Sequence, residues 1–175
     1  MPDVSLLDYR DKLPIRRSAQ PYYPRELARV IGATIHYTAG PPAMTIESVA
    51  AYQVGPNAQE AFPAIAYHLV IPADGSVCVC HDLGTRVWHS GAVIGGVARN
   101  ASHVGICYIG NVEPNEAQLA GIRAALRFCE AQLRRPLDSI EGHRDAPYAT
   151  ACPGPAWPAW ASAILSYRAD ADGNS

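Results

Sequence analysis

The sequence predicts a single α/β domain in which helices flank a central mixed β-sheet. Strand-like apolar segments alternate with segments of helical periodicity, and one pair of strands is joined by a tight turn. The 175 residues are 49% hydrophobic and 17% charged, which is enough apolar material for one packed core. Alternating strands and helices favour parallel pairing, whereas the hairpin adds an antiparallel pair, so the sheet should be mixed.

Residues 1–27 are rich in proline, arginine and tyrosine and have no clean period. We expect them to form an N-terminal arm packed on the domain. The domain itself is predicted to span 28–167, and the polar segment 168–175 to be a disordered tail.

The first strand of the domain ends at a Gly-Pro-Pro breaker that begins at Gly40. Alternation places Thr34, His36 and Thr38 on one face of this strand. A short helix is expected over 46–54, because Gly-Pro follows it directly.

Two further strands flank a turn at Ala73-Asp74-Gly75, which is a hairpin signal. Strict alternation in the first of them places Tyr67, Leu69 and Ile71 on one face and His68 on the other.

The segment HVGICYIGN is apolar on both faces, as expected for a central strand covered on each side. The clearest helix follows over 115–134, and a last helix is expected near 157–167. Apolar residues recur along the first of these helices at 3-4-3-4 spacing, which predicts a core-facing stripe made of Leu119, Ile122, Leu126, Cys129 and Leu133.

The N-terminus contains acidic residues and no long apolar run, so we expect no secretory signal peptide. No segment approaches the roughly 20 apolar residues that a membrane span needs. The net charge of -2 and the pI of 6.3 give no reason to expect nucleic acid or an anionic membrane as a partner. We therefore expect a monomer made in the cytoplasm, with no nucleic-acid and no membrane partner.

Five cysteines without a signal peptide are better explained as buried thiols or metal ligands than as disulfides. Cys78 and Cys80 share one face of a strand, which disfavours a bridge between them. His81 beside these two thiols leaves a second metal site open as a minor alternative.

Metal-competent side chains stand beside tight turns in the segments IHYTAG, EGHRDAP and TACPGP. A catalytic zinc site has three protein ligands and an open position for water, whose pKa falls from about 15.7 towards ~7. His36, His143 and Cys152 would supply two imidazoles and a thiolate. Their spacing matches no short zinc-binding pattern, so the residue types alone leave buried histidines and a buried cysteine as the alternative.

Six motifs occur in the order found in one enzyme family: IHYTAG, AYHLVIPADG, VWHSG, HVGICYIGN, GHRD and CPG. Over roughly 30–165 the sequence resembles the type 2 N-acetylmuramoyl-L-alanine amidases, which include phage lysozymes and peptidoglycan recognition proteins. The resemblance implies a Zn²⁺ cofactor in a surface groove, held by the residues that match the family ligands: His36, His143 and Cys152.

The same resemblance implies catalytic roles for Tyr67, which would orient water or stabilise the oxyanion, and for Thr150, which would sit over the metal. The implied reaction is hydrolysis of the amide bond between N-acetylmuramic acid and L-alanine in bacterial peptidoglycan. Thr150 could instead only cap a helix start. His89, Asn100 and Arg86 are candidate substrate contacts.

Two departures separate the sequence from the recycling branch of this superfamily, which acts on soluble fragments. Cys107 stands where those enzymes have a glutamate, and Cys152 stands where they usually have an aspartate. We therefore expect an endolysin-like enzyme that reaches the wall through a holin-made opening or a similar route. The alternatives are a non-catalytic peptidoglycan recognition module and a cytoplasmic amidase of soluble muropeptides.

Overall fold

The centre of the protein is a six-stranded sheet, described in a computed structural model that covers residues 4–56, 62–146 and 150–168. All neighbouring strands run parallel except β4 and β5, which form the predicted hairpin. The predicted mixed sheet is therefore confirmed. In spatial order the strands are β1 (Leu6–Asp8), β5 (Val77–Val79), β4 (Leu69–Ile71), β9 (His103–Tyr108), β3 (Gly32–Tyr37) and β10 (Ser139–Gly142).

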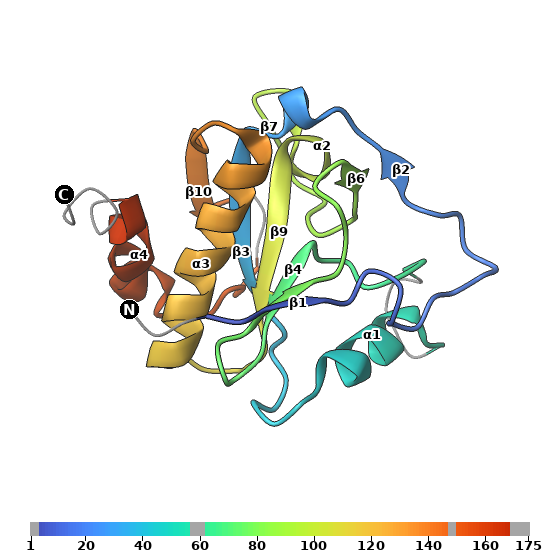
Figure 1. The fold of residues 1–175 in the computed structure, drawn as a ribbon, viewed down its shortest axis with the longest axis horizontal. Coiled ribbons are helices and arrows are strands. Elements are labelled where there is room, and N and C mark those ends of the chain that lie inside the picture. The colour runs from blue at the N-terminus through green and yellow to red at the C-terminus, as the bar shows by residue number, and fades with distance from the viewer. Residues whose placement is uncertain (1–3, 57–61, 147–149, 169–175) are drawn as a thin grey trace.

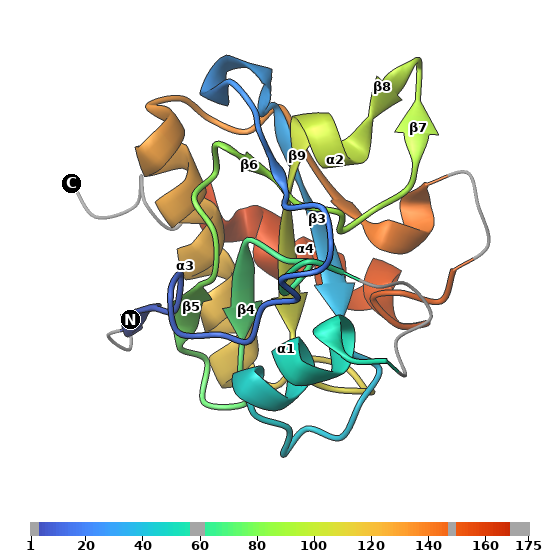
Figure 2. The same ribbon diagram turned by 90° about the vertical axis from the view of Figure 1, so that its right-hand side faces the viewer.

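Helices cover both faces of this sheet (Figures 1 and 2). α3 and α4 pack on one face, and α1 lies on the other. The helices are α1 (Ile46–Val54), α2 (Arg99–Ser102), α3 (Glu116–Leu133) and α4 (Trp157–Leu165), with 3-10 turns η1 (Leu27–Arg29), η2 (His143–Asp145) and η3 (Ser166–Arg168). Two small antiparallel pairs complete the fold: β2 (Tyr23–Pro24) with β6 (Thr85–Arg86), and β7 (Val93–Ile94) with β8 (Val97–Ala98).

Strand alternation gives the two faces of the sheet different roles. All six residues of β9 are buried, as predicted for a central strand. Ile35 of β3 belongs to the large apolar core under α3. His36 points to the opposite face, where its register partner Cys107 packs in a smaller cluster against α1. The candidate metal ligand of β3 therefore lies on the α1 side.

The 3-4-3-4 stripe of α3 faces the core as predicted, and Ile122, Leu126 and Cys129 are fully buried. A reciprocal capping box between Asn115 and Gln118 begins the helix. Arg134, in the left-handed conformation, ends it.

The N-terminal arm supplies a strand that the sequence did not predict. β1 pairs in parallel with β5 at one edge of the main sheet, and β10 adds the opposite edge. The three residues of β1 are all exposed, so they show no apolar alternation that would reveal a strand. The boundary at residue 27 stays a prediction, and the tail predicted over 168–175 lies outside the described residues except for the backbone of Arg168.

The alternation predicted around Tyr67 is wrong. Leu69 and Ile71 lie in the core under α3, whereas Tyr67 packs with Val70 against the cluster on the α1 side. β4 begins only at Leu69 and the chain bends at His68, so the two-residue period does not reach back to Tyr67. Tyr67 therefore shares the side of the sheet that carries His36.

All five cysteines are free, which agrees with the prediction that Cys78 and Cys80 form no bridge. Among the described residues, none of the helices has the length and apolar character needed to span a bilayer.

Candidate metal centre

Three metal-competent side chains from separate segments converge on the α1 side of the sheet. The ligand atoms of His36, His143 and Cys152 all lie within 4.8 Å of one another. Within the described ranges, no other group of three His, Cys, Asp or Glu side chains meets in this way. His36 is buried and the other two are half-buried, so the cluster is reached from the side of His143 and Cys152.

The spacing of His36 and Cys152 fits two ligands of a tetrahedral zinc site. His36 Nδ1 lies 3.6 Å from Cys152 Sγ. With Zn–S near 2.3 Å and Zn–N near 2.0–2.1 Å, a tetrahedral angle separates the two ligand atoms by about 3.5 Å. Two imidazoles and one thiolate leave a fourth position open, which is the arrangement of catalytic zinc sites.

Strand register brings the two histidines together. β10 pairs in parallel with β3, and Gly142 is the register partner of Ile35. The next residue along each strand direction is a histidine, so His143 comes beside His36 at the same edge of the sheet. Their ring centroids are 4.5 Å apart.

Arg144 ties the loop of His143 to the loop of Cys152. Its backbone N–H donates to the carbonyl of Cys152 at 2.6 Å, and its guanidinium donates to the carbonyl of Gly154 at 3.0 Å. The backbone N–H of Tyr37 also donates to Cys152 Sγ at 3.4 Å. Sequence reasoning assigned Arg144 no role; its place inside the GHRD motif was the available signal.

Asp145 holds the start of η2 and was also missed. Its carboxylate accepts hydrogen bonds from the Gly142 N–H at 2.7 Å and from the Trp157 indole N–H at 2.8 Å. A Cβ on Gly142 would lie 2.6 Å from the Trp157 ring, so only glycine lets the two pack this closely.

The protonation states suit metal binding. Burial, followed by the nearby His143 and His89 rings, holds the pKa of His36 well below its usual value, and burial also lowers the pKa of His143. Both rings are therefore neutral near pH 7. Burial raises the pKa of the Cys152 thiol to about 12, a shift that the Tyr37 N–H opposes, so a metal must displace this proton when it binds.

The two predicted catalytic residues lie beside the cluster in different ways. The Tyr67 ring is 5.3 Å from the His36 ring, and burial together with the nearby Cys107 and Cys152 thiols holds its pKa well above the usual value. Tyr67 is therefore a hydrogen-bond donor at neutral pH. The Thr150 hydroxyl accepts a hydrogen bond from the Cys152 N–H at 3.2 Å, which places it beside the backbone of Cys152.

The three predicted substrate contacts are separated by the fold. His89 reaches the cluster directly, because its Nδ1 is 3.1 Å from His36 Nε2. Asn100 uses its side-chain oxygen to accept from the Ser90 N–H at 2.7 Å, so it holds the turn that follows His89. Arg86 lies in β6 and pairs through the backbone with Tyr23.

The remaining histidines have partners of their own. His81 Nε2 is 2.8 Å from the Ile65 carbonyl, which does not favour a metal site with Cys78 and Cys80. His68 is fully buried, and its Nδ1 accepts from the Gly105 N–H at 3.0 Å. His103 lies between Ser102 and Ser139, which accounts for an imidazole at that position.

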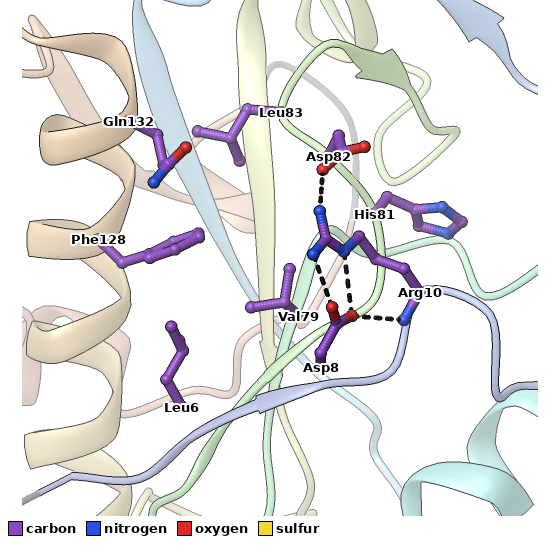
Figure 3. A pocket seen from close by; sticks show the side chains of 9 residues that line it. All are labelled: Leu6, Asp8, Arg10, Val79, His81, Asp82, Leu83, Phe128 and Gln132. Atoms are coloured by element: carbon purple, nitrogen blue, oxygen red, sulfur yellow. Dashed lines mark hydrogen bonds and ion pairs between the residues drawn. The ribbon is translucent and has the colours of Figure 1, made fainter.

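A separate pocket lies on the other side of the sheet, between β1, β5 and α3 (Figure 3). Arg10 crosses it and is held by Asp8 and Asp82, at 2.6 and 2.5 Å respectively. Leu6 and Phe128 form part of its apolar wall. None of the residues predicted to bind zinc, to act in catalysis or to contact substrate lines this pocket.

Comparisons with known proteins agree with the motif resemblance. Residues 26–155 match the family model described as N-acetylmuramoyl-L-alanine amidase. No curated protein matches the sequence significantly. Among solved structures, the N-acetylmuramoyl-L-alanine amidase LysC from Clostridium intestinale URNW is 19% identical, with a TM-score of 0.67 over 98% of this chain and 99% of that one.

Two further similar structures are a peptidoglycan recognition protein and a phage endolysin. Drosophila peptidoglycan recognition protein SD is 22% identical, with a TM-score of 0.68 over 87% of this chain and 89% of that one. The Ph2119 endolysin from Thermus scotoductus MAT2119 bacteriophage Ph2119 is 20% identical, with a TM-score of 0.65 over 91% of this chain and 98% of that one. At these identities the structures establish the shared fold, and the family follows from the model that covers most of the domain: the chain belongs to the N-acetylmuramoyl-L-alanine amidase family.

Proposed function

We propose that this chain is a zinc-dependent N-acetylmuramoyl-L-alanine amidase that acts on bacterial peptidoglycan in the manner of an endolysin. The observation that carries the proposal is the convergence of His36 Nδ1, the His143 ring and Cys152 Sγ in a family whose activity is amide hydrolysis. The scissile bond would be the amide that joins the lactyl group of N-acetylmuramic acid to L-alanine.

In this proposal His36, His143 and Cys152 hold Zn²⁺. A zinc ion in such a site supplies a Lewis acid and lowers the pKa of water towards ~7. Tyr67, which keeps its phenolic hydrogen at neutral pH, would donate a hydrogen bond to the oxygen of the scissile carbonyl as negative charge develops there. The Thr150 hydroxyl, which accepts from the Cys152 N–H, retains its own hydrogen for the same purpose.

The first test is mass spectrometry of purified peptidoglycan sacculi after incubation with the full chain, with and without a zinc chelator. We expect release of peptides that begin with L-alanine, loss of that release with chelator, and recovery when zinc is added back. Intact sacculi in all samples would contradict the proposal.

A matched pair of variants assigns the activity to the cluster. Cys152→Ala should abolish both zinc binding and peptide release, because it removes the only thiolate of the site. Cys129→Ala removes a thiol on the buried face of α3, away from the cluster, and should keep both, at a cost of about 1–2 kcal/mol in stability. Zinc-dependent activity in the Cys152→Ala protein would refute the ligand set.

A second candidate function is peptidoglycan recognition without catalysis, which the similarity to recognition protein SD supports at the level of the fold. The presence of both Cys152 and Tyr67 favours the enzyme. Co-sedimentation with sacculi that yields no new amine would support recognition instead. Comparison of intact sacculi with a soluble anhydromuropeptide separates an endolysin from an amidase of soluble fragments.

A further inference from the structure

A second imidazole lies directly behind the ligand histidine of β3. The Nε2 atom of His36, on the side of the ring away from Cys152, is 3.1 Å from Nδ1 of His89. The two rings meet edge to face, with centroids 5.2 Å apart and an interplanar angle of 82°. On its far side, His89 Nε2 lies 3.2 Å from the backbone carbonyl oxygen of His103. The His36 ring, the His89 ring and the His103 carbonyl thus form a buried series of hydrogen bonds that ends at the metal cluster.

The donor and acceptor roles along this series of hydrogen bonds determine which ring nitrogen carries each hydrogen. A carbonyl oxygen can only accept, so His89 must carry its hydrogen on Nε2. In the neutral ring, Nδ1 of His89 is then a bare acceptor, and its contact with His36 is a hydrogen bond only if His36 Nε2 donates. His36 therefore carries its hydrogen on Nε2, which leaves its Nδ1 lone pair facing Cys152 and His143.

Arg25 of the N-terminal segment holds the His103 carbonyl, which is the end of this hydrogen-bonded series away from the metal cluster. The guanidinium of Arg25 donates to the same His103 carbonyl at 2.7 Å and to the carbonyls of Asn100 and Leu83 at 3.1 and 2.8 Å. The His89 ring lies over Gly105, where a Cβ would come within 2.6 Å of it. The position of His89 is thus fixed by its hydrogen bond to the His103 carbonyl and by the close packing of its ring on Gly105.

We propose that His89 is a positioning residue that, anchored on the His103 carbonyl, holds His36 in the tautomer and orientation whose Nδ1 binds the metal. The inference rests on the proposed zinc site and extends it. Groups that orient a ligand histidine from outside typically contribute a factor of about 10–100 to metal affinity.

The tautomer is read directly in the metal-free full chain. A two-bond ¹⁵N–¹H correlation spectrum, with His36 assigned by a His36→Gln variant, should show a protonated Nε2 and an unprotonated Nδ1. The reverse pattern for His36 would overturn the proposal, whatever the protein binds.

Two near-isosteric variants separate the two nitrogens of His89. Asparagine places a polar atom where Nδ1 stands and can still accept from His36, whereas glutamine reaches the position of Nε2 and keeps only the outer contact. We expect His89→Asn to bind zinc within ~tenfold of wild type, and His89→Gln and His89→Leu to bind it about 10–100-fold more weakly, as measured by competition with a chromogenic chelator. Equal affinity of all three with wild type would overturn the proposal.

A variant that changes neither imidazole gives an independent check. Gly105→Ala should push the His89 ring off His36 and weaken zinc binding, while Gly91→Ala, which has open space around its Cβ position, should leave it unchanged. The d–d spectrum of the Co²⁺-loaded proteins should change for Gly105→Ala alone. Failure of the wild type to bind zinc would sink the proposed function, whereas normal zinc binding by every variant would sink only the role of His89.

Discussion

At the scale of single residues, Tyr67 and Cys152 carry the chemistry of the proposed mechanism, and burial shifts the pKa of both side chains. Burial keeps the phenol of Tyr67 protonated and raises the pKa of the Cys152 thiol. The first effect preserves a hydrogen-bond donor, and the second means that a thiolate forms only when a metal replaces its proton. In the proposed mechanism Tyr67 acts on the substrate and Cys152 on the metal, so experiments can separate the two side chains.

Tyr67→Phe should lower kcat by about 100–1000-fold, the usual cost of removing one donor to a developing oxyanion, while zinc affinity stays at the wild-type value. Peptide release from sacculi and chelator competition measure the two effects. Tyr52→Phe, on an exposed tyrosine of α1, is the matched control and should change neither. A Tyr67→Phe enzyme that works at the wild-type rate would leave Tyr67 as a packing residue.

The proposed metal ligands were accessible to sequence reasoning only through the motifs that surround them. The contact between His36 and His89 joins residues 53 positions apart, and Arg25 reaches a carbonyl 78 positions away. No local period encodes such contacts, because they arise from strand order and register. The face of Tyr67 was missed for a related reason: the bend before β4 interrupts the alternation from which it was inferred.

At the scale of the elements, long periodic segments were predicted well and short edge strands were not. α3 runs for 18 residues with an apolar stripe, and the helix predicted over 115–134 agrees with Glu116–Leu133 to within one residue at each end. β1 and β10 have three and four residues at the two edges of the sheet, and neither contains an alternating apolar pattern. Their pairing depends on neighbours that are distant in sequence, which a single-sequence pattern does not reveal.

The contribution of the Asn115 N-cap of α3 to stability can be measured directly. Asn115→Ala removes the side chain that accepts from the Gln118 N–H and donates to the Ala73 carbonyl. The free energy of unfolding should fall by about 1–2 kcal/mol, with zinc affinity unchanged because α3 lies on the opposite face from the cluster. Urea denaturation of the zinc-free protein measures the change. Glu116→Ala, one residue further on, is the control and should cost less than half as much; an equal loss would contradict the capping role.

At the scale of the whole molecule, the sheet separates the large apolar core on one face from the candidate metal site on the other. The face under α3 and α4 holds the large apolar core, whereas the α1 face buries a set of polar side chains around the cluster. Four histidines are at most 5% exposed: His36, His68, His89 and His103. Such a concentration of buried neutral imidazoles makes the whole fold sensitive to acid, since unfolding releases each ring to bind a proton.

The direction of that sensitivity follows from the pKa shifts. Burial lowers the pKa of all four rings, to about 3 for His89 and about 4 for His103. Arg25 adds to the effect on His68, His89 and His103, and the His143 and His89 rings add to it on His36. Below pH 6.5 the unfolded chain binds more protons than the folded one, so the stabilisation is complete above pH 6.5 and is lost as the pH falls towards the folded values. Between pH 7 and 5.5 each such ring should lower the free energy of unfolding by about 1 kcal/mol, so that the four together should remove a large part of the stability of a typical domain.

Urea denaturation of the chelator-treated protein at several pH values between 7 and 5 tests this expectation. The slope of the unfolding free energy against pH should correspond to several protons taken up on unfolding, and His103→Asn should reduce it by about one proton. Saturating zinc should shift the loss of stability to lower pH, because the metal competes with protons for His36 and His143 in the folded state. A flat profile between pH 7 and 5 would mean that these rings take up protons in the folded protein as readily as in the unfolded chain, and the hydrogen-bond directions assigned to His89 and His36 would then be wrong.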